Sequence, residues 1–405
     1  MKKYSVTFML TLVLCASALT CALMIGAYYL FQSRPTAVAP DPVSEYRALI
    51  QLIEELYIGE FDTEEINHAA MRAAVESLGD PWSYYMTPDE YADYLDRSKN
   101  RYAGIGVGVA YDEVTTGVLI LYVYKGSAAD IAGLAANDII IGVDGEDIYG
   151  LGIDGLRALL ERELGATADI AVLRPDGSTK IFTVEYNYVF VDPVSFSMLD
   201  DNIGYVSLVN FDEGAADRFI SAVNELIEQG ALAFVFDVRS NNGGRVSEMT
   251  RILDFLLPEG EIFISVDRSM QEDIIYSDME MIDMPAVVLV NSQSYSAAEY
   301  FAATLREYGY AEVIGEQTTG KNRMQITLSM PGGGALHISS SQYLTRNRVS
   351  LFDTGGLMPD WPVLLSDEEY ALFISGNLSY NDDPQVLKAL EVIGDKLNMK
   401  TLAAK

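Results

Sequence analysis

The sequence is poor in the side chains that hydrolytic enzymes most often use as nucleophile and base. Of its 405 residues only two are histidines, His68 and His337, and only two are cysteines, Cys15 and Cys21. Both cysteines lie inside an N-terminal apolar run, so the rest of the chain has no disulfide, no thiol nucleophile and no cysteine-based zinc site. A Ser-His-Asp arrangement has few candidates, and a catalytic base, if there is one, is expected to be a lysine.

Positive charge is also scarce. Lys plus Arg number 27 against 59 Asp plus Glu, which gives a net charge of −32. Nucleic acid is excluded as a partner because phosphate contacts need a basic surface, and the acidity itself is expected to serve solubility. The chain is long enough, and at 49% hydrophobic residues apolar enough, for two or three domains with cores of their own.

Residues 4–33 carry no charge at all. This apolar run exceeds the roughly 20 residues that span a bilayer, and Lys2 and Lys3 precede it. We therefore predict a cytoplasmic tip at 1–5, a transmembrane anchor at 6–31, and a location of the remaining chain on the extracytoplasmic side of the cell membrane, as a single-pass protein. A cleaved signal peptide is the alternative, although its apolar core is usually only about 7–15 residues long.

Composition and apolar spacing divide the rest of the chain. Prolines at 32–42 indicate a linker, and helical spacing follows over 43–100. Short strands with two short helices form one module at 101–190. Longer helices alternate with apolar strands over 191–375, which indicates βαβ units and a largely parallel sheet. Residues 376–405 are predicted to be a C-terminal helix or tail.

Ser296 stands between a predicted buried strand at 286–290 and an alanine-rich helix predicted at 297–308. The free amides and positive potential of a helix N-terminus suit a nucleophile whose reaction develops an oxyanion. The spacing of Ser296 and Glu299 is equally that of a capping box, in which the serine only terminates the helix.

Lys321 follows 25 residues later, at a predicted junction between a loop and a strand. A lysine near its ordinary pKa of about 10.4 is a poor base at neutral pH, but burial lowers that pKa. A buried Lys321 would take the Ser296 proton and return it to a leaving amine. The alternative is an ordinary surface lysine. The glycines at 332–334 are interpreted as a hairpin turn, His337 as a structural strand residue and His68 as solvated.

These motifs together resemble the C-terminal processing (tail-specific) serine peptidases over nearly all of residues 43–365. The segments that carry the resemblance are Leu78-Gly79-Asp80-Pro81-Trp82-Ser83-Tyr84-Tyr85, Ala103-Gly104-Ile105-Gly106-Val107, Gly126-Ser127-Ala128-Ala129, Asn137-Asp138-Ile139-Ile140, Asp237-Val238-Arg239-Ser240-Asn241-Asn242-Gly243-Gly244, the Ser296, Lys321 and Gln325 set, and Gly355-Gly356-Leu357-Met358-Pro359-Asp360.

The resemblance implies an α/β multidomain fold: an N-terminal transmembrane helix, a small helical region, a PDZ domain at 101–190 and a ClpP/crotonase-like βαβ catalytic core at 191–375. It implies a serine endopeptidase in which a PDZ domain recognises apolar protein C-termini and gates the site. The roles it implies are Ser296 as nucleophile, Lys321 as base and Gln325 holding the lysine amine. Oxyanion amides would come from Ala297 with Gly243 or Gly244, and Gly104, Ile105, Gly106 and Val107 would capture the substrate carboxylate.

The resemblance implies no metal or organic cofactor, and as partners it implies protein or peptide substrates, the membrane and possible copies of the same chain. Asn242, Thr319 and Asn322 depart from the residues usual in the family, and Arg346-Asn347 replaces a proline-containing turn. These departures leave open a catalytically impaired PDZ scaffold on the outer face of the membrane. A crotonase-like acyl enzyme is a third alternative, but the sequence has no evident nucleotide-binding element.

Overall fold

The computed structural model describes residues 6–32, 41–112, 114–160 and 162–403. The chain divides into two compact units, Met1–Ala70 and Met71–Lys405. The predicted cytoplasmic tip and residues 33–40 of the predicted linker lie outside the described residues. Pro42 already belongs to a helix capped by the Asp41 side chain, so the predicted linker extended too far.

The first unit consists of helices. Helix α1 spans Val6–Gln32, and its stretch Phe8–Ile25 has a mean hydropathy of 2.4 with none of it buried. Its length and composition fit a membrane span or a signal sequence. Helix α2 (Pro42–Leu56) has no buried residue, and α3 (Thr63–Glu76) runs across the boundary between the units. Within the first unit the Tyr46 hydroxyl donates to Asn67 Oδ1 at 2.7 Å.

The second unit contains a five-stranded antiparallel sheet in the order β3-β4-β5-β7-β8, with short β6 (Glu146–Asp147) paired to β5. The five strands are Val107–Tyr111, Val118–Val123, Ile139–Val143, Thr167–Leu173 and Thr179–Glu185. Helices α5 (Ala128–Ala132) and α6 (Gly152–Leu160) pack on this sheet over an apolar core. Strands β2 (Arg101–Gly104) and β9 (Asn187–Phe190) pair where the chain enters and leaves this region, so residues far apart in sequence close the module.

The largest core is built on a six-stranded sheet in the order β10-β11-β12-β15-β16-β19. Its strands are Val194–Leu199, Ile203–Leu208, Ala233–Asp237, Ala286–Val290, Ala311–Gly315 and Trp361–Pro362. All neighbouring pairs are parallel except β10 with β11. The predicted largely parallel sheet is thus confirmed. Both central strands are buried along their whole length, as continuous apolar runs require.

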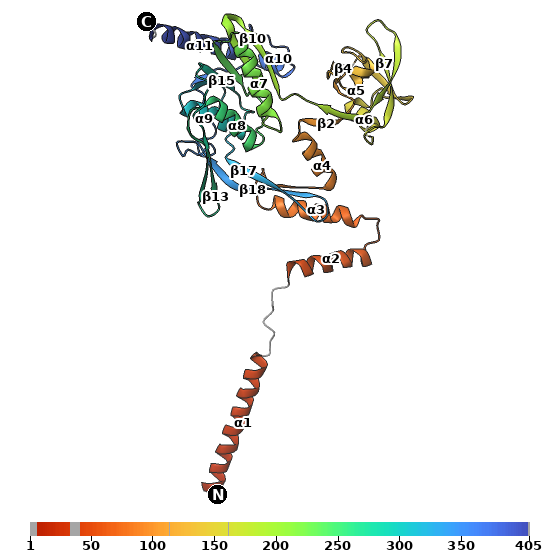
Figure 1. Ribbon diagram of the computed structural model, residues 1–405. Helices are drawn as coiled ribbons and strands as arrows, with labels where there is room; N and C mark the ends of the chain where they lie inside the picture. The colour runs from red at the N-terminus through yellow and green to blue at the C-terminus, as the bar shows by residue number, and fades with distance from the viewer. Residues whose placement is uncertain (1–5, 33–40, 113, 161, 404–405) are drawn as a thin grey trace. The chain divides into compact units, whose positions relative to one another are not determined.

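Helices cover both faces of this sheet. Alternate residues of β12 point to opposite faces, so Phe234 and Phe236 belong to one apolar cluster and Val235 to another. Helices α7 (Ala215–Glu228), α8 (Val246–Leu256) and α9 (Ala297–Glu307) supply the first cluster, and α11 (Pro384–Ala403) supplies the second (Figure 1). The carboxyl ends of β12 and β15 therefore emerge from a rigid three-layer core.

A second sheet borders the candidate site. The hairpin of β17 (Arg323–Ser329) and β18 (Ala335–Leu344) turns at the predicted glycine segment. Strand β18 also pairs with β1 (Tyr84–Met86) and β13 (Gly260–Asp267), and β14 (Glu272–Ser277) follows β13. Helix α4 (Pro88–Arg97) follows β1 through a capping box on Thr87. The remaining described helices are the single 3₁₀ turn at Asp200–Asn202 and α10 (Asp367–Ile374).

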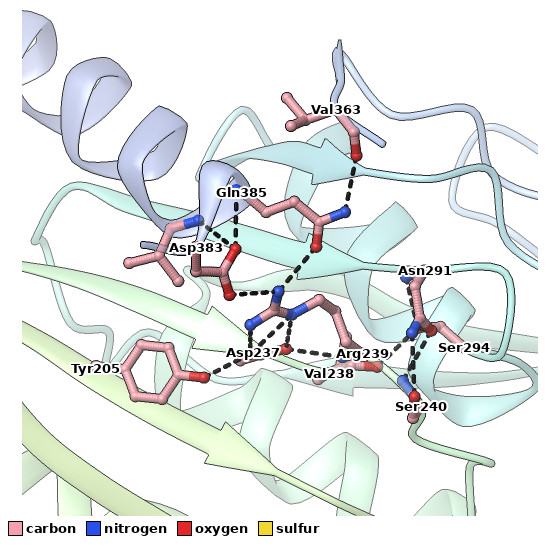
Figure 2. Close-up of polar contacts among 11 residues, drawn as sticks. Tyr205, Asp237, Val238, Arg239, Ser240, Asn291, Ser294, Val363, Asp383 and Gln385 are labelled. Atoms are coloured by element: carbon pink, nitrogen blue, oxygen red, sulfur yellow. Dashed lines mark hydrogen bonds and ion pairs between the residues drawn. The ribbon is translucent and has the colours of Figure 1, made fainter. Parts of the chain in front are cut away.

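A buried ion network fixes the loop after β12. Arg239, whose side chain is only 2% exposed, donates to Asp237 and Asp383, and its Nη1 also donates to Gln385 Oε1 at 2.8 Å (Figure 2). Asp383 and Gln385 lie at the start of α11. The same figure shows Ser294 Oγ donating to the Val238 carbonyl at 2.7 Å. The loop after β12 is therefore tied both to α11 and to the loop after β15.

Candidate active site

Ser296 lies in the sharp turn between β15 and α9. Its backbone angles, φ 60° and ψ −122°, fall where residues with a side chain are strained. A strained turn between a strand and a helix is one way in which folds expose a nucleophilic serine. The Ser296 amide donates to Glu299 Oε2 at 3.0 Å, which is the glutamate half of the predicted capping box. The Ser296 side chain lines a cavity of about 1210 Å³.

Lys321 lines the same cavity and precedes β17, at the predicted junction between loop and strand. Burial lowers its pKa to about 8, although the charges of Asp80 and Glu299 act in the opposite direction. Its Nζ lies 4.4 Å from the ring centroid of Trp82 and 5.8 Å from that of Tyr295. A lysine with this pKa is partly neutral near pH 8, so it has a lone pair with which to accept a proton.

Gln325 is the third predicted residue on this cavity wall. Its Nε2 donates to the Arg323 carbonyl and to Ser339 Oγ, each at 3.0 Å, so these contacts stay within the β17–β18 hairpin. In the described part of the chain no hydrogen bond joins Lys321 Nζ to Ser296 or to Gln325. The structure thus brings the three side chains to one cavity without placing them in hydrogen-bond contact.

Glu299 connects the two candidate catalytic segments, a role that the sequence did not suggest beyond the capping box. Its carboxylate accepts from the Ser296 amide, from the Lys321 amide at 2.9 Å and from the Gly320 amide at 2.6 Å, and also from the Thr318 hydroxyl. Burial raises the pKa of Glu299, and these hydrogen bonds oppose that shift. One buried carboxylate therefore sets the backbone positions of both Ser296 and Lys321.

The predicted oxyanion amides meet at this turn. A Cβ on Gly243 would lie 2.8 Å from Ser296 Cβ and 3.0 Å from the Ala297 nitrogen, and Gly243 has φ +91°, so only glycine fits. The Gly243 amide, however, already donates to Asn241 Oδ1 at 2.8 Å. In the described part of the chain the amides of Gly244 and Ala297 have no such acceptor. Of the two glycines, Gly244 is thus the one with a free donor.

The comparisons with known proteins assign two domains. Residues 202–363 match peptidase family S41, and residues 119–174 match the PDZ domain. The chain carries an S41 peptidase domain and a PDZ domain. Its homologues are named carboxyl-terminal processing proteases, and the S41 match supports a serine protease.

Two curated relatives span nearly the whole chain. The carboxy-terminal processing protease CtpA of Bacillus subtilis is 25% identical over 398 residues, which cover 96% of this chain and 84% of that one. The carboxyl-terminal-processing protease of Synechocystis sp. is 26% identical over 406 residues, covering 93% and 92%. A solved putative S41 protease from Bacteroides fragilis shares the fold, with a TM-score of 0.57 at 18% identity over 90% of this chain and 94% of that one.

The predicted loop from Gly104 to Val107 lines a second cavity, of about 430 Å³, whose wall also includes Asp93, Asp96 and Arg97 of α4. A Cβ on Gly106 would lie 2.2 Å from Ser127 Cβ, so glycine is required there. The Ile105 carbonyl accepts from the Ala129 amide, and the Gly106 carbonyl accepts from the Tyr124 amide. Among the described residues β3 pairs with β4 alone, so its other edge, beside α6, has no strand partner there.

Two of the residues that depart from the family pattern, Thr319 and Asn322, make hydrogen bonds beside Lys321. Asn242 is exposed, and the structure offers no explanation for it. The Thr319 hydroxyl donates to the Ser292 carbonyl at 2.9 Å and ties the Lys321 loop to the Ser296 loop. Asn322 is buried and donates to Ser350 Oγ at 2.8 Å. Thr319 and Asn322 therefore fix the chain on either side of Gly320 and Lys321.

Proposed function

We propose that this protein is a membrane-anchored serine endopeptidase that cleaves exported proteins near or from their C-termini with a Ser296-Lys321 dyad. The observation that carries the proposal is the convergence of Ser296 and a half-buried Lys321 of lowered pKa on one cavity, above a carboxylate that holds both backbones. A ClpP/crotonase-like assignment of the core and the extracytoplasmic location are part of the same proposal.

In the proposed reaction neutral Lys321 accepts the Ser296 hydroxyl proton as Oγ attacks the scissile carbonyl carbon. The resulting oxyanion is stabilised by the Ala297 amide together with that of Gly244, or with that of Gly243 once it leaves Asn241. The Lys321 ammonium then returns its proton to the departing amine, which leaves an acyl-enzyme. A water molecule activated by Lys321 hydrolyses that ester. The amine of Lys321 must first approach Ser296, and Gln325 is proposed to hold it there.

Substrate selection is proposed to reside in the PDZ domain. The carbonyls of Ile105 and Gly106 accept from the amides of Ala129 and Tyr124, and in the described part of the chain the amides of Ile105 and Gly106 have no acceptor, so these amides are proposed to bind a terminal carboxylate. The substrate backbone would pair with the open edge of β3, and its apolar side chains would enter the cavity beside Leu156 and Leu160.

The test of catalysis is cleavage of an unstructured protein with an apolar C-terminus by the full chain in detergent. We expect the parent to cleave and Ser296→Ala and Lys321→Ala to be inactive. Ser292→Ala, an exposed serine of the same loop, and Lys388→Ala, another lysine over a tryptophan ring, serve as matched controls that retain activity. Equal cleavage by all variants would refute the dyad.

The test of recognition is binding of a peptide with an apolar C-terminus, as the free acid and as the amide. The acid should bind more tightly to the Ser296→Ala protein. Leu156→Ala should weaken binding because it removes part of the cavity wall. Ile181→Ala, which changes an exposed residue of the same sheet on β8, should not. Equal affinity for acid and amide would contradict carboxylate capture.

A catalytically impaired scaffold is the second candidate. Two observations favour it. Lys321 Nζ lies over the ring of Trp82 and makes no hydrogen bond with Ser296 in the described part of the chain. The Gly243 amide already donates to Asn241 Oδ1. Peptide binding without cleavage by the parent, under conditions that include full-length substrates, would support this candidate over the peptidase.

A further inference from the structure

The amine of Lys321 lies in a corner formed by two aromatic rings. The ring centroids of Trp82 and Tyr295 are 5.6 Å apart, and Lys321 Nζ lies over the face of Trp82 at 4.4 Å. A lysine ammonium at this distance is attracted by the negative face of an indole, whereas a neutral amine is not. The position of Nζ in the structure is therefore one that the charged form prefers.

The backbone segment that carries Trp82 is held in place by contacts other than the one with Lys321. The Trp82 amide donates to Asp80 Oδ1 at 3.3 Å, and Arg323 lies 3.1 Å from the same carboxylate. The Ser83 hydroxyl also donates to Asp80, and the Ser339 amide donates to Ser83 Oγ at 3.0 Å. The segment that carries Trp82 is thus pinned to both strands of the hairpin that begins directly after Lys321.

We propose that Trp82 is a positioning residue for Lys321, whose ring face retains the charged ammonium away from Ser296 and releases the amine when it loses its proton. This inference rests on the proposed peptidase function. The release explains how one lysine can lie apart from Ser296 in the structure and still approach it as a base. Because the indole stabilises the ammonium, it also moves the onset of activity to higher pH.

Three other titratable groups around this corner have pKa values shifted away from that of Lys321. Burial opposes ionisation of Asp80, but hydrogen bonds from Ser339 and Ser83 and the charge of Arg323 keep its pKa below the usual value. Burial lowers the pKa of His337, on β18, to about 4, and burial raises that of Tyr295 above its usual range. Glu299, with a raised pKa, faces Lys321 from α9. Because the pKa of Glu299 is also raised, the Lys321→Met variant is what assigns a titration in this corner to Lys321.

Fluorescence tests the proposal without any substrate. The chain has two tryptophans, and the second, Trp361, also carries a lysine ammonium over its ring, that of Lys388 at 4.1 Å. The full-length Trp361→Phe protein reports Trp82 alone. We expect its emission to titrate with a midpoint near pH 8, and expect that titration to vanish when Lys321→Met is added. The proposal is overturned if the emission still titrates after Lys321→Met is added. It is also overturned if the emission of the Trp361→Phe protein does not change between pH 6 and 10.

Activity gives the second readout. Trp82→Leu keeps apolar volume but removes the ring face, so the acid-side midpoint of kcat/KM should fall by about half a unit to one unit. Trp82→Phe, a weaker ring face, should give an intermediate midpoint, and Trp361→Leu should give the parent midpoint. A lower rate with an unchanged midpoint in Trp82→Leu would show a merely structural role. A parent that cleaves nothing would refute the peptidase function and leave the fluorescence result standing.

Discussion

Two cations of this molecule, one buried and one half-buried, have opposite surroundings. Arg239 is buried among Asp237, Asp383 and Gln385, and although burial disfavours its charge, the two carboxylates raise its pKa above the usual range. Lys321 is half-buried against aromatic rings, and in the described part of the chain no carboxylate lies within ion-pair distance of it. Burial then prevails and its pKa falls to about 8. A fully paired charge maintains the fold, and an unpaired one is able to exchange a proton.

The largest expected effect is on catalysis at Lys321. Lys321→Met should reduce kcat/KM by about 10³- to 10⁴-fold, because no other group on the cavity replaces the base. Its free energy of unfolding, from urea titration, should stay equal to that of the parent or rise, because a half-buried unpaired ammonium is removed. If Lys321→Met unfolds more easily than the parent and still cleaves substrate, Lys321 serves the fold rather than catalysis, which contradicts the account.

The counterpart is Arg239→Met. The change leaves Asp237 and Asp383 buried without their cation, so the free energy of unfolding should fall by about 3–5 kcal/mol. Arg218→Met is the matched control, since its ion pair in the described part of the chain joins it to Asp192, with side chains 47% and 39% exposed, and its cost should stay below about 1 kcal/mol. Equal losses from both changes would contradict the structural role of the Arg239 network.

Glu299→Gln tests whether the buried carboxylate that holds the backbones of Ser296 and Lys321 is needed for activity. Glutamine offers one acceptor oxygen where the carboxylate offers two, so it cannot serve the amides of Ser296, Gly320 and Lys321 together. We expect kcat/KM to fall by about 10- to 100-fold with KM little changed, because the reacting groups lose alignment. Glu307→Gln, at the other end of α9, should leave kcat/KM at the parent value.

Activity should also depend on pH in the direction that a lysine base requires. Lys321 works as the neutral amine, so kcat/KM should rise about tenfold per pH unit below pH 8 and level off above it. The profile of an imidazole base would instead level off near pH 6.5. His337 is not such a base, because burial lowers its pKa to about 4.

Much of the fold followed from sequence because apolar spacing is local. The predicted strand at 286–290 and the start of the helix at Ala297 match the structure residue for residue, and the strand predicted at 231–238 is two residues too long at its start and one at its end. Several strands of the second sheet, such as β13 and β14, were not predicted, because their burial depends on partners far along the chain.

Some features of the candidate site could likewise be predicted from the sequence, and others could not. Ser296, Lys321 and the glycine loop were identifiable from residue type and spacing, and they do line or border one cavity. The fourfold acceptor role of Glu299 and the contact of Trp82 with Lys321 were not, because both join segments that only the folded chain brings together. Asn241 occupying the Gly243 amide is likewise a tertiary detail of the turn.

The most direct measurement is the titration of the Lys321 side chain itself, by NMR of protein labelled at lysine Cε, with the resonance assigned by its loss in Lys321→Met. The account predicts a midpoint near pH 8 for this resonance. A Lys321 midpoint at the ordinary value of about 10.4 would contradict the central claim that burial without an ion pair makes this lysine a base.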